Sequence, residues 1–150
     1  MINGGVVHGA GGLAGELAHV HTVGPAGASR TLLECFAAEG LLLPSLAVDL
    51  DRLEPVLGGT TSADRRRRAA LADAVAGALG SVTALLNPQV VVIGGPWGTR
   101  HDFPTLVAER LADAAIGAEV RPAALGEAAP LTGARIHALR AAQASLAEAL

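Results

Sequence analysis

The stretch LLNPQVVVIGG, residues 85–95, combines the end of a helix, a strand and a glycine pair. Asn87-Pro88 is expected to end the helix, because proline disfavours helical geometry in the residue before it. The β-branched run that follows is typical of a strand buried on both faces of a largely parallel sheet. Ligands of open α/β sheets bind at the carboxyl ends of strands, where Gly94-Gly95 stand. This stretch indicates the α/β class.

Segments on both sides of this strand continue the alternation of helices and strands. A long helix is predicted over 63–86, with Thr60-Thr61-Ser62 as its N-cap. After the strand come a helix over 105–116, a short strand over 119–122 and a helix from 132 to the end. The apolar residues of the long helix recur at steps of three and four and form one stripe: Leu71, Val75, Ala78, Leu79, Val82 and Leu86.

The chain opens on what reads as a short hairpin. Asn3-Gly4 is a strong tight-turn signal, and Val6-Val7 follow it as a strand. Since two residues precede the turn, the first strand of this hairpin is almost missing. We therefore expect the sequence to begin inside its own first hairpin.

Three further elements are expected before the long helix. Residues 19–23 alternate as a short strand does, and 30–42 have helical spacing, with Gly40 as the C-terminal stop. Residues 44–59 suggest a short helix or turn. The apolar face of the second element consists of Leu32, Leu33, Phe36 and Ala37.

The composition predicts one soluble, cytoplasmic domain, spanning 1–150. Hydrophobic residues make up 51% and aromatic residues 2% of the 150, so the core must be aliphatic. The net charge of −3 excludes a basic surface for nucleic acid, and we expect the arginines at 65–68 to form a solvated first turn. The single cysteine excludes an internal disulfide. A secretory signal and a membrane-spanning run are not expected.

The polar group with most chemical content consists of Glu16, His19, His21, Glu34 and Cys35. Zinc would need the two histidines and the cysteine, but residues two apart on a strand face opposite sides. A cysteine on a helix commonly packs as a small apolar residue. Glu16 and His19 form either a surface pair or part of a binding site. The glycine-rich segment before them favours the binding site, because glycines let a backbone approach a ligand closely.

Four segments in order resemble the ROK family (repressors, open reading frames and sugar kinases). GGVVHGAGGLAGELAHV (4–20) is similar to its Gly-Glu-x-Gly-His sugar motif, with alanine for the second glycine. TLLECFA (31–37) resembles its Gly-Cys-Leu-Glu turn into a helix, and LLNPQVVVIGG its Asn-Pro-x-x-hydrophobic-Gly-Gly strand. APLTGARIHAL (129–139) is similar to its closing Gly-Ala helix.

The resemblance implies the C-terminal lobe of a sugar-kinase/actin-like (ribonuclease H-like) ATPase fold. It implies that Glu16, His19 and Glu34 bind sugar hydroxyls, and that Gly94 and Gly95 lie where the family places the adenosine of ATP. The cysteines of the family's zinc motif would fall on Pro25, Gly27 and Leu32, which cannot ligate zinc, so the zinc site is expected to be lost.

No segment of this sequence resembles the family's N-terminal lobe, which carries the first phosphate loop and the catalytic aspartate. We therefore expect this chain to be the sugar-sensing C-terminal part of a ROK-type transcriptional regulator. Its partners would be a sugar, a second copy of the chain and, through an upstream helix-turn-helix, DNA. The alternatives are part of a ROK sugar kinase, with ATP and magnesium, and a remnant that associates through apolar faces. No kinase activity is expected from this chain alone.

Overall fold

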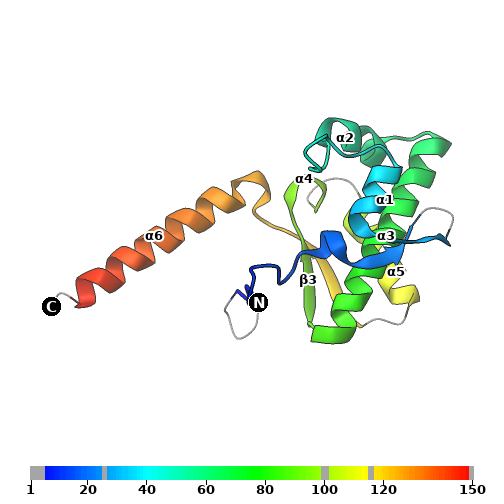
Figure 1. Ribbon diagram of the computed structural model, residues 1–150. Coiled ribbons are helices and arrows are strands. Elements are labelled where there is room, and N and C mark those ends of the chain that lie inside the picture. The colour runs from blue at the N-terminus through cyan, green and yellow to red at the C-terminus, as the bar shows by residue number, and fades with distance from the viewer. Residues whose placement is uncertain (1–5, 25–26, 99–101, 115–116, 149–150) are drawn as a thin grey trace.

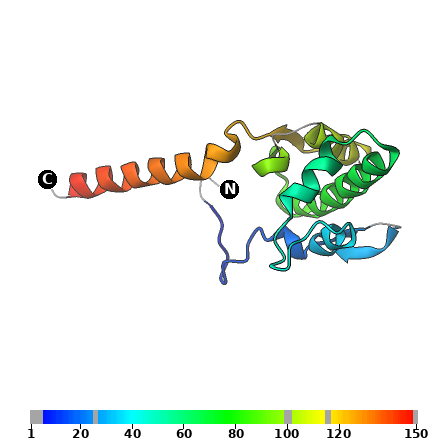
Figure 2. The same ribbon diagram turned by 90° about the horizontal axis from the view of Figure 1, so that it is seen from above.

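The computed structural model describes residues 6–24, 27–98, 102–114 and 117–148. They form a layered body from which one long helix extends (Figure 1). Helix α3 (Ser62–Leu86) occupies the middle layer of the body, as the view from above shows (Figure 2). One outer layer holds β1 (His21–Val23), β2 (Ser29–Thr31) and α1 (Leu32–Ala38); the other holds β4 (Glu119–Pro122) and α5 (Phe103–Asp113). This mixture of helices and small sheets agrees with the predicted α/β class.

Helix α3 begins and ends where its sequence predicts. The hydroxyl of its N-cap Thr61 accepts a hydrogen bond from the backbone N–H of Asp64, 3.1 Å away. Asn87 closes the helix with a left-handed backbone, φ +44°. Burial is wider than one stripe, because elements pack around α3 from several sides. Its buried residues are Leu71, Ala72, Ala74, Val75, Ala76, Ala78, Leu79, Gly80 and Thr83.

Judged by length and composition alone, α3 could cross a membrane, and it is the one such helix among the described residues. The core helix of a folded domain meets the same criterion, so the expectation that no segment spans a membrane stays a prediction. Half of the most apolar window of α3 is buried inside the fold. Packing in the core accounts for this apolar composition.

Strands β3 (Val90–Ile93) and β4 pair in parallel, with Val90 opposite Glu119 and Ile93 opposite Pro122. Helix α5 connects them, so this part of the chain is a β–α–β unit, as predicted. The expectation that β3 is buried on both faces is wrong: Val92 is 60% exposed, and the burial alternates along the strand. A two-stranded sheet covered on one face leaves every second residue of β3 accessible.

The N-terminal part differs most from its prediction. Val6 and Val7 lie in irregular chain and are exposed, so the predicted strand is not formed there, while Asn3-Gly4 lies outside the described residues. His19 ends a 3-10 turn, η1 (Leu17–His19), and β1 starts two residues later. Strand β2, which pairs with β1 in antiparallel fashion, was not anticipated.

The chain between these strands and α3 forms two helices. Helix α1 stops at Gly40, which adopts φ +67° as a C-terminal glycine should. The uncertain segment 44–59 contains helix α2 (Leu50–Gly58), whose N-cap Asp49 accepts a hydrogen bond from the backbone of Arg52. Both helices pack against α3.

The arginine run at the start of α3 is solvated only in part. Arg65 and Arg66 are exposed, as expected. Arg67 contacts the carboxylate of Glu39 at 2.8 Å, and Arg68 donates to the carbonyl oxygen of Leu57 at 2.6 Å. The expectation of a wholly solvated turn is therefore wrong, because two guanidinium groups hold the ends of α1 and α2 on α3.

One cluster of buried side chains forms the core of the described body. Its largest fully buried members come from four separate segments: Leu41, Leu57, Leu71, Phe103 and Leu111. The last helix, α6 (Ala129–Glu148), follows a 3-10 turn, η3 (Gly126–Ala128), and contributes nothing to this cluster. It begins three residues before its predicted start.

Candidate functional site

An apolar groove lies between the η1–α1 layer, helix α3 and strand β3. Its volume is about 400 Å³. Two segments of the predicted site meet there, since Gly15 and Gly94 both line it. The lining residues are all apolar or glycine: Gly15, Leu17, Ala18, Leu32, Leu33, Phe36, Val48, Val75, Leu79, Val91, Val92, Ile93 and Gly94.

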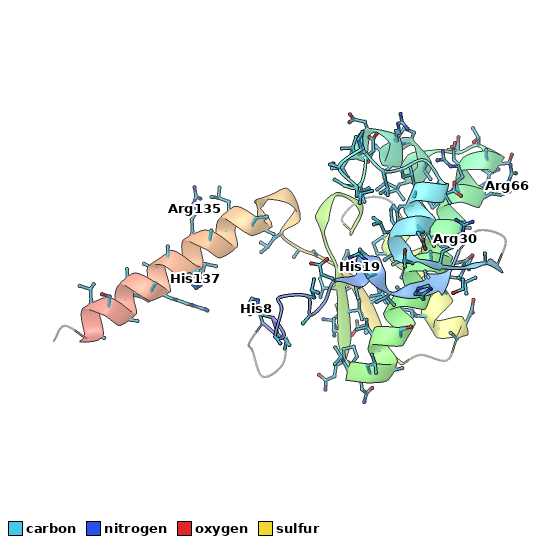
Figure 3. All side chains as sticks on the ribbon, viewed as in Figure 1. His8, His19, Arg30, Arg66, Arg135 and His137 are labelled. Atoms are coloured by element: carbon cyan, nitrogen blue, oxygen red, sulfur yellow. The ribbon has the colours of Figure 1, made fainter. Side chains whose placement is uncertain are left out.

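Glu16 is the N-cap of the η1 turn and His19, labelled in Figure 3, is its last residue. Gly15, Leu17 and Ala18 of the same segment line the groove. The side chains of Glu16 and His19 are exposed, and neither forms a hydrogen bond or ion pair with another described residue. The turn itself is held by a backbone hydrogen bond from His19 N–H to the carbonyl oxygen of Glu16, 3.4 Å long. A carboxylate and an imidazole free of protein partners can bind the hydroxyls of a ligand.

Glu34 has a structural role at the start of α1. Its Oε2 accepts a hydrogen bond from the backbone N–H of Thr31 at 2.8 Å, and its own N–H donates to the Thr31 hydroxyl at 3.2 Å. These reciprocal bonds form a capping box. The bonds from Thr31, first that of its backbone, lower the pKa of Glu34, with smaller contributions from His21 and Arg30. The Thr-x-x-Glu spacing in the sequence could have revealed this role.

The three residues predicted to bind sugar hydroxyls, Glu16, His19 and Glu34, therefore lie in two separate places. Glu16 and His19 share the η1 turn, next to the groove that Gly94 borders. Glu34 caps α1, where the neighbouring charges that act on it belong to His21 and Arg30. Its other carboxylate oxygen, Oε1, accepts no hydrogen bond from the described residues.

The glycine pair after β3 is shaped by the turn into the short helix α4 (Gly95–Gly98). Gly95 adopts φ +74°, which a side chain rarely tolerates. At Gly98 an added Cβ would collide with the carbonyl of Ile93. Gly95 and Gly98 are thus explained by the path of the chain at the carboxyl end of β3, whereas a Cβ at Gly94 would meet only Ala123, at 3.4 Å.

A second, more polar hollow of about 350 Å³ lies where β1 and β2 meet α3. His21 Nδ1 lies 3.4 Å from the Ser29 hydroxyl there, and Thr22 Oγ1 donates to the carbonyl oxygen of Ala74 at 2.7 Å. Sequence reasoning missed this site. Gly77 and Ser81, which line it, lie one helical turn apart in α3 and interrupt its apolar pattern.

The thiol of Cys35 is buried in the core beside Phe36, as expected for a small apolar residue. Burial raises its pKa, which disfavours the thiolate that a metal requires. Within the described ranges, His, Cys, Asp and Glu side chains form no cluster of three that could hold a metal. Of the positions aligned with the family's zinc cysteines, Leu32 lies in the core, Gly27 adopts φ +75°, and Pro25 lies outside the described residues.

No protein-family model and no curated protein matches the sequence. The resemblance to the ROK family consequently depends on the four motifs and their order along the chain.

Proposed function

We propose that this chain is the sugar-sensing C-terminal lobe of a ROK-type transcriptional regulator, with a sugar-kinase/actin-like fold. One observation supports it above the others: Gly15, Leu17 and Ala18 border the same groove as Gly94, which is distant in sequence. Beside that groove, Glu16 and His19 have no hydrogen-bond partners among the described side chains. Three of the four segments that resemble family motifs, 4–20, 31–37 and 85–95, therefore contribute to one groove.

The chemistry of a sugar suits such a place. A hexose has hydroxyls around its edge and apolar C–H groups on its faces. In this proposal Glu16 accepts hydrogen bonds from hydroxyls, His19 donates or accepts, and the apolar wall near Leu17 covers a sugar face. Glu34 contributes through its second carboxylate oxygen after its cap is formed. Sensing needs neither ATP nor magnesium in this chain, and DNA is bound by a separate domain.

The alternative is part of a ROK sugar kinase. The positive φ of Gly95 at the carboxyl end of β3 favours it, because such turns let a nucleotide approach the backbone. ATP and magnesium would then be bound together with a second lobe that supplies the catalytic base. The two functions differ in their product, since only the kinase forms ADP.

Calorimetric titration of the chain with hexoses and N-acetylated amino sugars tests the proposal. One of these sugars is expected to bind, and Glu16→Gln or His19→Ala should weaken binding at least about tenfold, as loss of a hydrogen bond to a charged group does. Glu109→Gln on α5 and His137→Ala on α6 are matched controls at exposed positions and should bind normally. Absence of binding, or equal binding by all four variants, would refute the proposed site. Sugar-dependent ADP formation by a protein that joins this chain to the second lobe would select the kinase.

A further inference from the structure

The described residues that line the apolar groove carry no polar side chain. The groove volume of about 400 Å³ falls within the range of small-molecule sites, about 300–1,000 Å³. A hydroxyl that leaves water for such walls loses hydrogen bonds and gains none from a side chain, which is unfavourable. A sugar alone therefore matches the groove poorly.

The polar groups of the proposed sugar site stand next to the lining residues and not among them. Glu16 lies between Gly15 and Leu17 in the sequence, and His19 follows Ala18. These three neighbours line the groove, and two of them, Leu17 and Ala18, are half-buried, whereas Glu16 and His19 are exposed. The η1 segment thus offers hydrogen-bonding groups on one side and an apolar wall on the other. A ligand that fits both has a polar part and an apolar part.

The burial of the lining residues suits an apolar part of variable length. Phe36 and Val75 are 3% and 6% exposed, whereas Val92 on β3 is 60% exposed. An apolar group that covers these side chains removes hydrocarbon surface from water, which is favourable in proportion to the area. Because the lining is exposed at Val92, a longer group can extend past β3 into solvent.

The charges next to the groove favour an uncharged polar part. The acidic and basic residues adjacent in sequence to a lining residue are all carboxylates: Glu16, Glu34 and Asp49. Asp49 is paired with Arg52 at 3.2 Å, and Arg30 acts on Glu34. Glu16 forms no ion pair with a described residue. A phosphate or carboxylate of a ligand at η1 would therefore meet a like charge, which weakens binding.

We propose that the ligand is an uncharged glycoside with an apolar aglycone, which lies in the groove while the sugar hydroxyls bind Glu16 and His19. The aglycone, an alkyl or aromatic group, contacts Leu17, Phe36 and Val92. This inference rests on the proposed function, because it takes the sugar site at η1 as given. It accounts for the apolar character of the lining, which a sugar alone leaves unexplained.

Calorimetric titration of the full chain with a series of n-alkyl glycosides tests the inference. The probes are the methyl, butyl and hexyl glycosides of glucose and of N-acetylglucosamine, each below the concentration at which it forms micelles. For one of the two sugars, Kd should fall at least about tenfold from methyl to butyl and further to hexyl, since each fully buried methylene is worth about a fourfold change. The heat capacity change of binding should become more negative as the chain lengthens.

Strand β3 offers a matched pair of variants. Val90 and Val92 lie on the same exposed face of the strand, but Val92 lines the groove and Val90 does not. Val92→Asp places a charge beside the aglycone, so hexyl and methyl glycosides should bind it about equally. Val90→Asp is the control and should keep the wild-type dependence on chain length. Circular dichroism checks that both fold, and the wild-type series tests the inference without them.

The outcomes separate this inference from the proposed function. If Glu16→Gln weakens the binding of every glycoside but Kd does not change with chain length, the inference is overturned and the sugar site remains. If hexyl tri(ethylene glycol) ether, which has the chain but no sugar, binds as tightly as the hexyl glycosides and Glu16→Gln has no effect, the sugar function is refuted and the inference with it. The 6-phosphate of the butyl glycoside that binds should bind at least about tenfold more weakly. Equal or tighter binding of this phosphate overturns the assignment of an uncharged ligand.

Discussion

Helices α3 and α6 are the two longest in the described structure, at 25 and 20 residues, and both are rich in alanine and leucine. Their surroundings differ completely. Strand β1 and helices α1, α2 and α5 all contact α3, which buries nine of its residues. Helix α6 extends from the body and contributes no residue to the core. Similar composition therefore leads to opposite burial, and the neighbouring elements decide which.

Small residues show the same contrast at closer range. In α3, Ala72, Ala74 and Ala78 are completely buried, so neighbouring elements approach the helix axis closely. The alanines of α6 from Ala134 to Ala147 are exposed. An alanine-rich helix can thus serve as the centre of a core or as an exposed arm.

Equal truncations in the two helices give the largest difference that this comparison predicts. Leu71→Ala in α3, where the side chain is 1% exposed, should lower the free energy of unfolding by about 2–5 kcal/mol. Leu139→Ala in α6 should change it by less than about 0.5 kcal/mol, because an exposed side chain leaves no cavity. Urea unfolding of dilute protein measures both values.

Dilution matters in that experiment, because any association between copies would add concentration-dependent stability. Each variant is therefore compared with the wild type at two protein concentrations. If Leu139→Ala costs as much as Leu71→Ala at the lower concentration, α6 packs on its own body and the contrast between the helices is wrong.

The same contrast shows what a sequence can predict. Helix α3 has a threonine N-cap, a C-terminal Asn-Pro and regular apolar spacing, all local signals, and its bounds follow from them. The strand over 119–122 was predicted correctly for a similar reason. The exposure of α6 and of Val92 could not be predicted, because it depends on which elements return to cover them. A local sequence pattern does not predict which distant segments pack together.

The candidate site was predictable to a similar extent. The sequence singled out the glycine-rich segment and the Gly-Gly pair separately, and in the structure Gly15 and Gly94 border one groove. His19 was predicted to start a strand, but it ends the 3-10 turn η1, which precedes that strand. Glu34 was assigned to a ligand alone, although Thr31-x-x-Glu34 is a local capping signal.

Replacing one glycine by alanine in each helix should change stability by an intermediate amount, with a loss in α3 and a gain in α6. A Cβ at Gly77 of α3 would collide with the hydroxyl oxygen of Thr22. Gly77→Ala should therefore displace Thr22 from the carbonyl of Ala74 and cost about 1–3 kcal/mol. Thermal unfolding with Thr22→Val as a second variant measures the cost. A double variant less destabilised than the sum of the two would identify Thr22 as the group displaced.

Gly133 of α6 is the matched position, where an added Cβ meets nothing within 4 Å. Gly133→Ala should stabilise the helix locally by about 0.5–1 kcal/mol, since alanine loses less backbone entropy than glycine. The helical signal in circular dichroism should rise without a change in the unfolding midpoint of the body. A loss of helical signal would mean that α6 is packed more tightly than its exposure indicates.

The smallest predicted effect concerns pH and the capping box of α1. Because its folded-state pKa is lowered from about 4.5, the Glu34 carboxylate adds stability above that value and loses it as pH falls through the folded pKa. Glu34→Gln keeps an acceptor for the Thr31 N–H but cannot titrate. We expect the variant to lose less stability than the wild type between pH 5 and a pH below the lowered pKa, in urea titrations at each pH.

Glu109→Gln, which removes an exposed carboxylate on α5, is the control and should keep the wild-type slope. All three proteins share their remaining carboxylates, so the evidence is the difference between the slopes. Equal slopes in all three proteins would mean that Glu34 is not held by Thr31 in solution, and would leave both of its carboxylate oxygens free to bind a ligand.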